Sequence, residues 1–167
     1  PSLDGFSPAK LGASLQEIWV FKTQSSIKLS TAIVKRRVFI GSDDGFVYAL
    51  NLNDGSLIWK FETQGNVESS PLVLDDHVYV GSGDGFVYKL RAADGKLVWK
   101  YETEDQVLGG PNWIQSPDGK NTWILAGSYD FRLHCIRADD GTKVWDYETG
   151  DYINGSPAVS NGQTVFG

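Results

Sequence analysis

The residues best suited to nucleophilic chemistry are a histidine and a cysteine that stand next to each other, His134 and Cys135. A thiolate beside an imidazole can act as a nucleophile, but neighbouring residues on a strand point to opposite faces of the sheet. We therefore expect both side chains to fill a core, and His77, at a predicted strand start, to be solvated. One cysteine excludes an intramolecular disulfide, and two histidines leave little material for a zinc site.

Carboxylates are more numerous, and they recur at fixed places. Glu62, Glu102 and Glu148 each precede a threonine. Acid–base catalysis by a pair of carboxylates needs two different environments, whereas these three residues share one, so we expect a structural or solvated role. The turns at 43–45 and 84–85 could attract calcium, but they offer one or two carboxylates each and lack EF-hand spacing, which favours turn formation.

Composition excludes two classes of partner. The net charge of -6 and the pI near 4.8 argue against a nucleic-acid-binding surface, which needs a basic patch. No apolar run approaches about 20 residues, so no membrane span is predicted. The chain begins at Pro1 and shows no signal-peptide pattern, so we expect a processed or excised segment.

The elements that must position these groups are indicated by an internal repeat. Trp19, Trp59 and Trp99 are 40 residues apart, and Trp145 follows after 46. The same pair of intervals separates three Asp-Gly pairs, Asp54-Gly55, Asp94-Gly95 and Asp140-Gly141. A period of about 40 residues is typical of a β-propeller blade with four strands.

Within the second unit, strands are predicted over 71–74, 77–81, 86–91 and 97–102. Asp-Gly pairs at the hairpin tips supply the left-handed backbone that tight turns require. The two middle strands are apolar on both faces, which suits a blade packed between two neighbours. The predicted fold is all-β, a partial β-propeller of four-stranded antiparallel blades.

The segments that end in these tryptophans resemble the tryptophan-docking motif of the pyrroloquinoline-quinone (PQQ) repeat family. The first copy has Ala49, Asn51, Asp54-Gly55 and Trp59, with Asp where the family usually has Thr. The resemblance implies that the indole packs flat against the adjacent blade, that the glycine permits a close approach of the backbone, and that the aspartate accepts hydrogen bonds from turn amides. The residues assigned this docking role are Trp59, Trp99, Trp145, Gly55, Gly95, Gly141, Asp54, Asp94 and Asp140.

The predicted organisation is a lead-in segment, 1–16, followed by a partial propeller, 17–167. The propeller divides into a lone outer strand (18–23), three blades (27–63, 67–103 and 107–149) and a half blade (153–167). Residues 4–8 together with 19–23 resemble the start of secreted bacterial PQQ-repeat propellers, which implies a location in the bacterial periplasm or outside the cell.

Propellers close with about four to eight blades, so this arc leaves a blade face uncovered. Three solutions remain open. The chain is a fragment of a longer protein, or two copies join their open edges as a homodimer, or a four-bladed ring closes on the lone strand.

Residues that break the repeat are the candidates for recognition. Tyr129, Phe131 and Tyr152 lie on the rim where the loops between blades meet the channel mouth. Trp113 and Trp123 flank a six-residue insertion at the opposite end. Exposed aromatic side chains suit protein recognition, although both tryptophans could simply pack beneath the longer loop.

Three functions follow from these expectations. The first is a non-enzymatic scaffold that binds a protein partner, since the chain resembles the propeller lipoprotein of the outer-membrane barrel-assembly machinery and the propeller sensor modules of bacterial surface proteins. The alternative is a piece of a quinoprotein dehydrogenase, which would use PQQ and calcium. No adjacent cysteine pair and no cofactor-binding set is recognisable, so no cofactor is predicted for this chain. The third is a spacer without a ligand.

Overall fold

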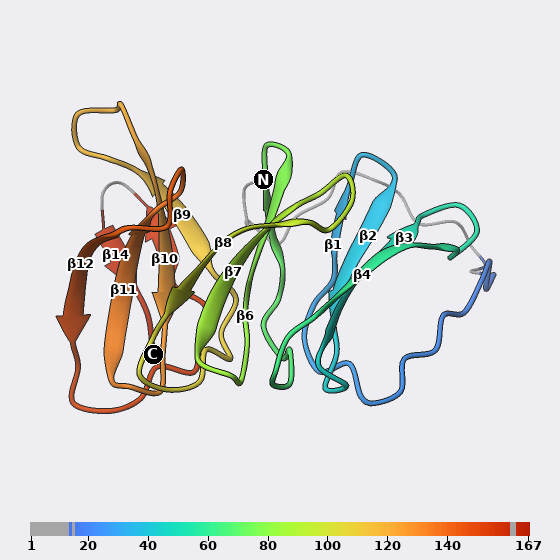
Figure 1. Ribbon diagram of the computed structural model, residues 1–167, viewed down its shortest axis with the longest axis horizontal. Coiled ribbons are helices and arrows are strands. Elements are labelled where there is room, and N and C mark those ends of the chain that lie inside the picture. The colour runs from blue at the N-terminus through green and yellow to red at the C-terminus, as the bar shows by residue number, and fades with distance from the viewer. Residues whose placement is uncertain (1–13, 15, 161–162) are drawn as a thin grey trace.

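The computed structural model describes residue 14, residues 16–160 and residues 163–167. Three four-stranded antiparallel sheets stand side by side and a two-stranded sheet follows them (Figure 1). The strands are β1 (Ala32–Val34), β2 (Arg37–Gly41), β3 (Phe46–Asn51), β4 (Leu57–Glu62), β5 (Leu72–Leu74), β6 (His77–Gly81), β7 (Phe86–Arg91), β8 (Leu97–Glu102), β9 (Asn112–Gln115), β10 (Thr122–Gly127), β11 (Arg132–Arg137), β12 (Lys143–Glu148), β13 (Ala158–Ser160) and β14 (Gln163–Val165). The predicted all-β architecture of four-stranded blades is confirmed, and in each blade the strands pair in chain order.

Turn residues explain why the chain reverses where it does. Gly45 and Gly85, between the second and third strands of their blades, have φ angles of 85° and 84°. At the hairpins between the third and fourth strands, Gly55 and Gly95 have φ angles of 68° and 72°. Glycine adopts this left-handed backbone without the steric cost that a Cβ brings. The period of the Asp-Gly pairs therefore sets the period of the hairpins.

The core lies between blades rather than inside one of them. Val47 and Ala49 of β3 lie in one apolar cluster with Val78, Val80 and other residues of the next blade. A second cluster joins the second and third blades in the same way. Since both faces of a middle strand are covered, the central residues of β3 and β7 are buried on both faces, and all but Lys89 are apolar or aromatic.

The structure differs from expectation before the first blade. Residues 18–23, predicted as a lone outer strand, are not a strand. A strand needs hydrogen bonds from a neighbour, and no described strand pairs with this segment. It is held instead by side chains, including the Trp19 indole. Nearly all of the predicted lead-in, 1–16, lies outside the described residues.

The last sheet holds two strands, β13 and β14, which pack behind the third blade. Of the described residues, none belongs to a helix with the length and apolar character that crossing a membrane requires.

Candidate functional site

The indole of Trp59 links the first blade to the second. Its Nε1 donates a hydrogen bond to the carbonyl oxygen of Ala92 at 3.0 Å. A Cβ placed on Gly95 would lie 2.7 Å from the indole ring, so only glycine fits there. Trp59 thus covers the Asp-Gly turn of the following blade, not that of its own. The neighbouring indoles repeat this geometry, Trp19 with Leu52 and Gly55, and Trp99 with Ala138 and Gly141.

The aspartates of these turns act within their own hairpins. Asp54 Oδ1 accepts hydrogen bonds from the hydroxyl and the amide of Ser56, and Asp140 Oδ1 accepts the same pair from Thr142. These bonds stabilise the carboxylate form and lower the pKa of both aspartates. Asp94 likewise accepts from the amide of Lys96 at 3.3 Å.

Trp145 occupies the same position in the third blade but lacks this partner. Its side chain is partly exposed, and its indole nitrogen donates no hydrogen bond to any residue that the structure describes. A cavity of about 540 Å³ lies beside it, lined by Leu133, Tyr147, Phe166 and others. Tyr147 is 60% exposed. We call this surface of Leu133, Trp145, Tyr147 and Phe166 the open face.

On the rim, an aspartate connects each blade to the segment that precedes it. Asp84 Oδ2 accepts a hydrogen bond from the amide of Gln64 in the loop before its blade, at 2.8 Å, and another from the Tyr88 hydroxyl at 2.7 Å. The other two junctions repeat the arrangement, with Asp44, Gln24 and Tyr48 in one and Asp130, Glu104 and His134 in the other. These carboxylates are therefore already engaged in joining the blades.

The same contacts change proton affinities. Burial and the nearby carboxylate of Asp44 raise the pKa of Tyr48 to about 12. Burial by itself would raise the pKa of Asp44, but the hydrogen bonds from Tyr48, Gln24 and Phe46 outweigh it and lower that pKa. The carboxylate is thus held ionised and the phenol is held protonated.

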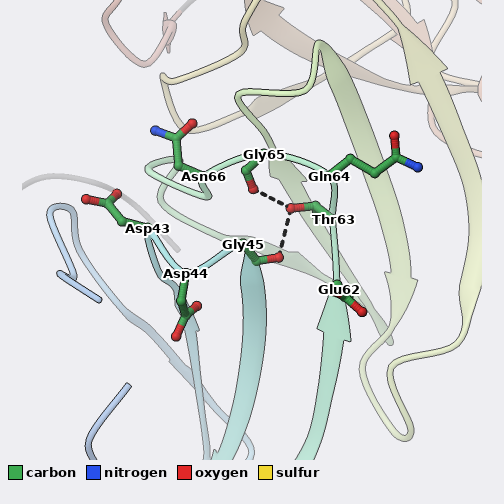
Figure 2. Close-up of a pocket in the computed structure, with 8 residues that line it drawn as sticks. All are labelled: Asp43, Asp44, Gly45, Glu62, Thr63, Gln64, Gly65 and Asn66. Carbon is green, nitrogen blue, oxygen red and sulfur yellow. Dashed lines mark hydrogen bonds between the residues drawn. The ribbon is translucent and has the colours of Figure 1, made fainter. Parts of the chain in front are cut away.

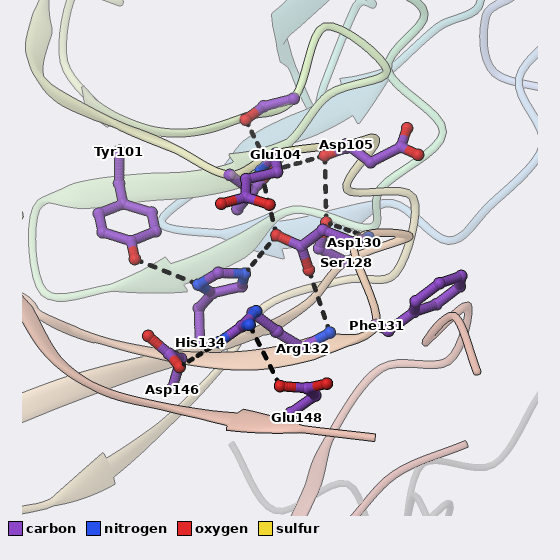
Figure 3. A network of polar contacts seen from close by, with 12 residues as sticks. Tyr101, Glu104, Asp105, Ser128, Asp130, Phe131, Arg132, His134, Asp146 and Glu148 are labelled. Carbon is purple, nitrogen blue, oxygen red and sulfur yellow. Dashed lines mark hydrogen bonds and ion pairs between the residues drawn. The ribbon is translucent and has the colours of Figure 1, made fainter. Parts of the chain in front are cut away.

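The third blade replaces this tyrosine with His134, whose polar network is drawn in Figure 3. His134 Nε2 lies 2.8 Å from Asp130 Oδ2, and Nδ1 lies 3.1 Å from the Tyr101 hydroxyl of the preceding blade. A neutral imidazole with its proton on Nε2 satisfies both contacts. His134 and Cys135 are both buried. Burial raises the pKa of the Cys135 thiol to about 12, which opposes thiolate formation.

A polar hollow of about 660 Å³ lies on the rim of the first blade (Figure 2). Thr63 spans it, since its hydroxyl lies 2.9 Å from the Gly45 carbonyl oxygen and 2.7 Å from that of Gly65. Among the described residues, no three histidine, cysteine, aspartate or glutamate side chains gather as a metal site.

Of the three rim aromatics, Tyr129 and Phe131 lie between β10 and β11 of the third blade, and Tyr152 lies in the loop after β12. The rings of Tyr129 and Tyr152 stack with centroids 4.7 Å apart. Phe131 is 48% exposed and has a φ of 65°, a left-handed backbone that the first two blades assign to glycine. Tyr152 is 50% exposed. The structure therefore brings these three candidates onto one rim.

The two tryptophans beside the insertion line one cavity of about 620 Å³, but they do so from different faces of the sheet. Trp113 pairs with Ile124 and Trp123 pairs with Ile114, so their side chains lie on opposite faces of the sheet. Both are partly buried, Trp113 against the cluster of the second and third blades and Trp123 against that of the half blade. The two ends of the insertion are joined by a hydrogen bond, which the Ser116 hydroxyl accepts from the backbone amide of Asn121.

Sequence reasoning missed the role of Lys89. This lysine is 6% exposed, and its Nζ donates to the Ala138 carbonyl oxygen at 2.7 Å, the oxygen that also accepts from Trp99. Burial lowers its pKa. The signal was present, because Lys89 stands where the first blade has Ala49 and the PQQ motif has alanine.

Comparison with known proteins identifies relatives of this fold. A family model of the PQQ-repeat type, described as outer membrane protein assembly factor BamB, matches residues 12–166. No curated protein sequence matches the chain.

Solved structures are similar in fold. BamB from Moraxella catarrhalis is 23% identical with a TM-score of 0.71 over 86% of this chain and 47% of that one, so this chain spans about half its length. The computationally designed Ika4 protein is 20% identical with a TM-score of 0.72 over 92% of both chains. The WD40 β-propeller domain of Doa1 is 19% identical with a TM-score of 0.71 over 87% of this chain and 48% of that one. At these identities the likeness establishes the propeller fold.

Proposed function

Because the chain belongs to the PQQ-repeat family of the outer membrane protein assembly factor BamB, we propose that it is a segment of a non-catalytic propeller that binds protein partners in the bacterial periplasm. The observation that carries the first part of this proposal, a segment of a larger propeller, is the open face, whereas partner binding is supported by the family match. The open face presents apolar rings around a cavity of about 540 Å³, at a position where the other blades are covered by protein. Exposed apolar surfaces of this kind mark interaction sites.

The occupant that fits the open face is a further blade of the same propeller. Three indoles of this chain each donate a hydrogen bond to a backbone carbonyl oxygen of the following blade. Each also packs on a glycine of that blade that has a left-handed backbone. Trp145 presents the same donor and ring in the same register, since it pairs with Cys135 as Trp99 pairs with Lys89. A blade carrying another Asp-Gly turn would complete the contact.

A second copy of the chain is the other occupant to test. Sedimentation velocity at several protein concentrations, on the wild type and on Trp145→Ala, distinguishes the two. We expect no discrete dimer. A dimer of defined stoichiometry that the substitution dissociates would assign the open face to a second copy.

The scaffold also has to be separated from a quinoprotein dehydrogenase. We propose that this segment functions without PQQ and calcium, because its donor groups do not gather as a metal site in the described residues. Addition of both should leave the absorbance spectrum and the melting temperature unchanged, since a ligand that binds the folded state raises that temperature. A saturable shift in both would favour the dehydrogenase.

Partner binding is the direct test. We expect a saturable complex with purified periplasmic components of the outer-membrane barrel-assembly machinery, measured by biolayer interferometry. The absence of any complex, together with no response to PQQ, would leave the spacer as the better account.

A further inference from the structure

The charges of this molecule are divided unevenly between its two ends. The loops on the rim, counted with adjoining strand residues, carry eleven carboxylate side chains and two cationic ones. Counted in the same way, the loops at the opposite end (34–37, 51–57, 74–77, 91–97, 115–122 and 137–143) carry seven and eight. The rim loops are 24–30, 42–46, 62–70, 82–86, 102–110, 128–132 and 148–156. A net charge of -6 thus understates how acidic the rim is. Such a field attracts a partner of opposite charge.

The two cations of the rim are already paired. Lys28 Nζ lies 3.1 Å from Asp43 and 2.7 Å from Glu68. Arg132 pairs with Asp146 at 2.8 Å and with Glu148 at 3.2 Å, as Figure 3 shows. No further lysine or arginine of the described residues forms an ion pair with a rim carboxylate.

Three of the unpaired carboxylates adjoin the rim aromatics. Asp151 precedes Tyr152 and binds its amide. The carbonyl oxygen of Asp105 accepts from the Ser128 hydroxyl, immediately before Tyr129. Glu104, the residue before Asp105, is exposed, as are Asp105 and Asp151. We call the aromatic residues Tyr129, Phe131 and Tyr152, with these three carboxylates, the acidic aromatic step.

Phe131 adds an observation that structural need does not explain. A bulky residue with a φ of 65° is strained, and the equivalent positions hold Gly45 and Gly85. Phe131 is 48% exposed, so burial of its ring contributes little stabilisation to offset the backbone strain. Strained residues that persist on a surface tend to mark functional sites.

We propose that the acidic aromatic step binds an extended, arginine- or lysine-bearing segment of a protein partner. A guanidinium stacks on aromatic faces and pairs with carboxylates. The acidic aromatic step offers both kinds of group to a single arginine side chain of the partner. This inference rests on the proposed function, since it names the chemistry of a partner for the same scaffold. Carbohydrate stacking is the alternative that the test resolves.

The test uses fluorescence anisotropy of a fluorescein-labelled peptide of alternating arginine and serine. We expect saturable binding that is lost as ionic strength rises from about 0.01 M to about 1 M, because the Debye length falls below the contact distances. The same peptide with glutamate in place of arginine should not bind. Binding of neutral oligosaccharide instead, or of neither probe, would overturn the proposal.

The decisive variant is Phe131→Gly, which restores the glycine of the other blades. We expect the melting temperature to rise by about 2–4 °C, because the backbone strain is removed, while peptide binding weakens about tenfold. Opposite signs in the two measurements exclude misfolding as the cause. Unchanged binding would contradict the role of the aromatic ring.

Matched variants locate the effect. Asp105→Asn and Asp151→Asn should each weaken binding, whereas Asp75→Asn at the opposite end and Tyr147→Ala on the open face should not. Loss of peptide binding in Asp75→Asn would point to a general charge effect, and loss in Tyr147→Ala would place binding on the open face; either result would overturn the site. If barrel-assembly components bind but Phe131→Gly leaves that complex intact, the scaffold stands and this inference fails.

Discussion

The junction between the second and third blades and the open face of the third blade present equivalent residues of the repeat. They differ in what covers those residues. Trp99 is 9% exposed and bonds to Ala138, whereas Trp145 is partly exposed and bonds to no described residue. Two residues after each indole, the ring of Tyr101 lies 5.5 Å from that of His134, while the ring of Tyr147 lies 6.5 Å from that of Phe166. The comparison teaches that the docking motif stabilises a pair of blades, not the blade that carries it.

Truncating the two indoles should break this comparison most clearly. Trp99→Ala removes a buried ring and its hydrogen bond, and we expect a loss of about 3–5 kcal/mol in the free energy of unfolding. Trp145→Ala should cost about 1 kcal/mol, because the ring is already partly solvated. Urea unfolding monitored by circular dichroism measures both. Equal losses would show that the energy of the motif lies within one blade.

The glycine that receives the indole provides the second test. Gly141 has a φ of 75°, and a Cβ there would lie 2.8 Å from the ring of Trp99. Gly141→Ala combines backbone strain with overpacking, so we expect a loss of about 2–4 kcal/mol.

The control for that variant is Gly150→Ala, where an added Cβ meets nothing within 4 Å. We expect a change below about 0.5 kcal/mol in the same urea experiment. A loss of stability in Gly141→Ala as small as that in Gly150→Ala would mean that the residues of the junction can move to accommodate the added Cβ.

Much of the fold follows from the sequence, because turn chemistry and strand alternation are local. The strands predicted over 77–81, 86–91 and 97–102 are β6, β7 and β8, while the first strand begins at Leu72, one residue later than predicted. Local rules failed at 18–23, where the pattern of an outer strand is present but no described strand pairs with it. A strand is a property of two segments, and sequence alone shows one of them.

Contacts between blades were harder to predict than the blades themselves. The repeat shows which residues are equivalent but not which neighbour each one touches, so it placed the Trp59 indole against an adjacent blade without identifying Gly95 as the residue that it covers. One signal was available at the third blade. Tyr101 and His134 both depart from the residues of the earlier repeats, and they contact each other across the junction.

Alkaline pH tests the same comparison through a smaller change in the free energy of unfolding. The covered junctions hold buried tyrosine hydroxyls, which ionise at high pH. The pKa of Tyr48 is raised from 10.0 to about 12 by burial and by Asp44. A raised pKa means that the folded state keeps a proton which the unfolded chain loses first. The associated stability is therefore fully present below pH 10 and is lost as pH rises toward about 12.

Tyr48→Phe isolates this contribution. At neutral pH we expect it to cost about 1 kcal/mol, since the hydroxyl no longer donates to Asp44 Oδ2 at 2.8 Å, although the Gln24 amide still does. Between pH 10 and about 12 the variant should lose less stability than the wild type, because one phenol no longer titrates. Urea midpoints across that range measure the difference, with absorbance recording tyrosine ionisation. Parallel pH profiles for the two proteins would show that this phenol ionises equally well in the folded junction and in the unfolded chain.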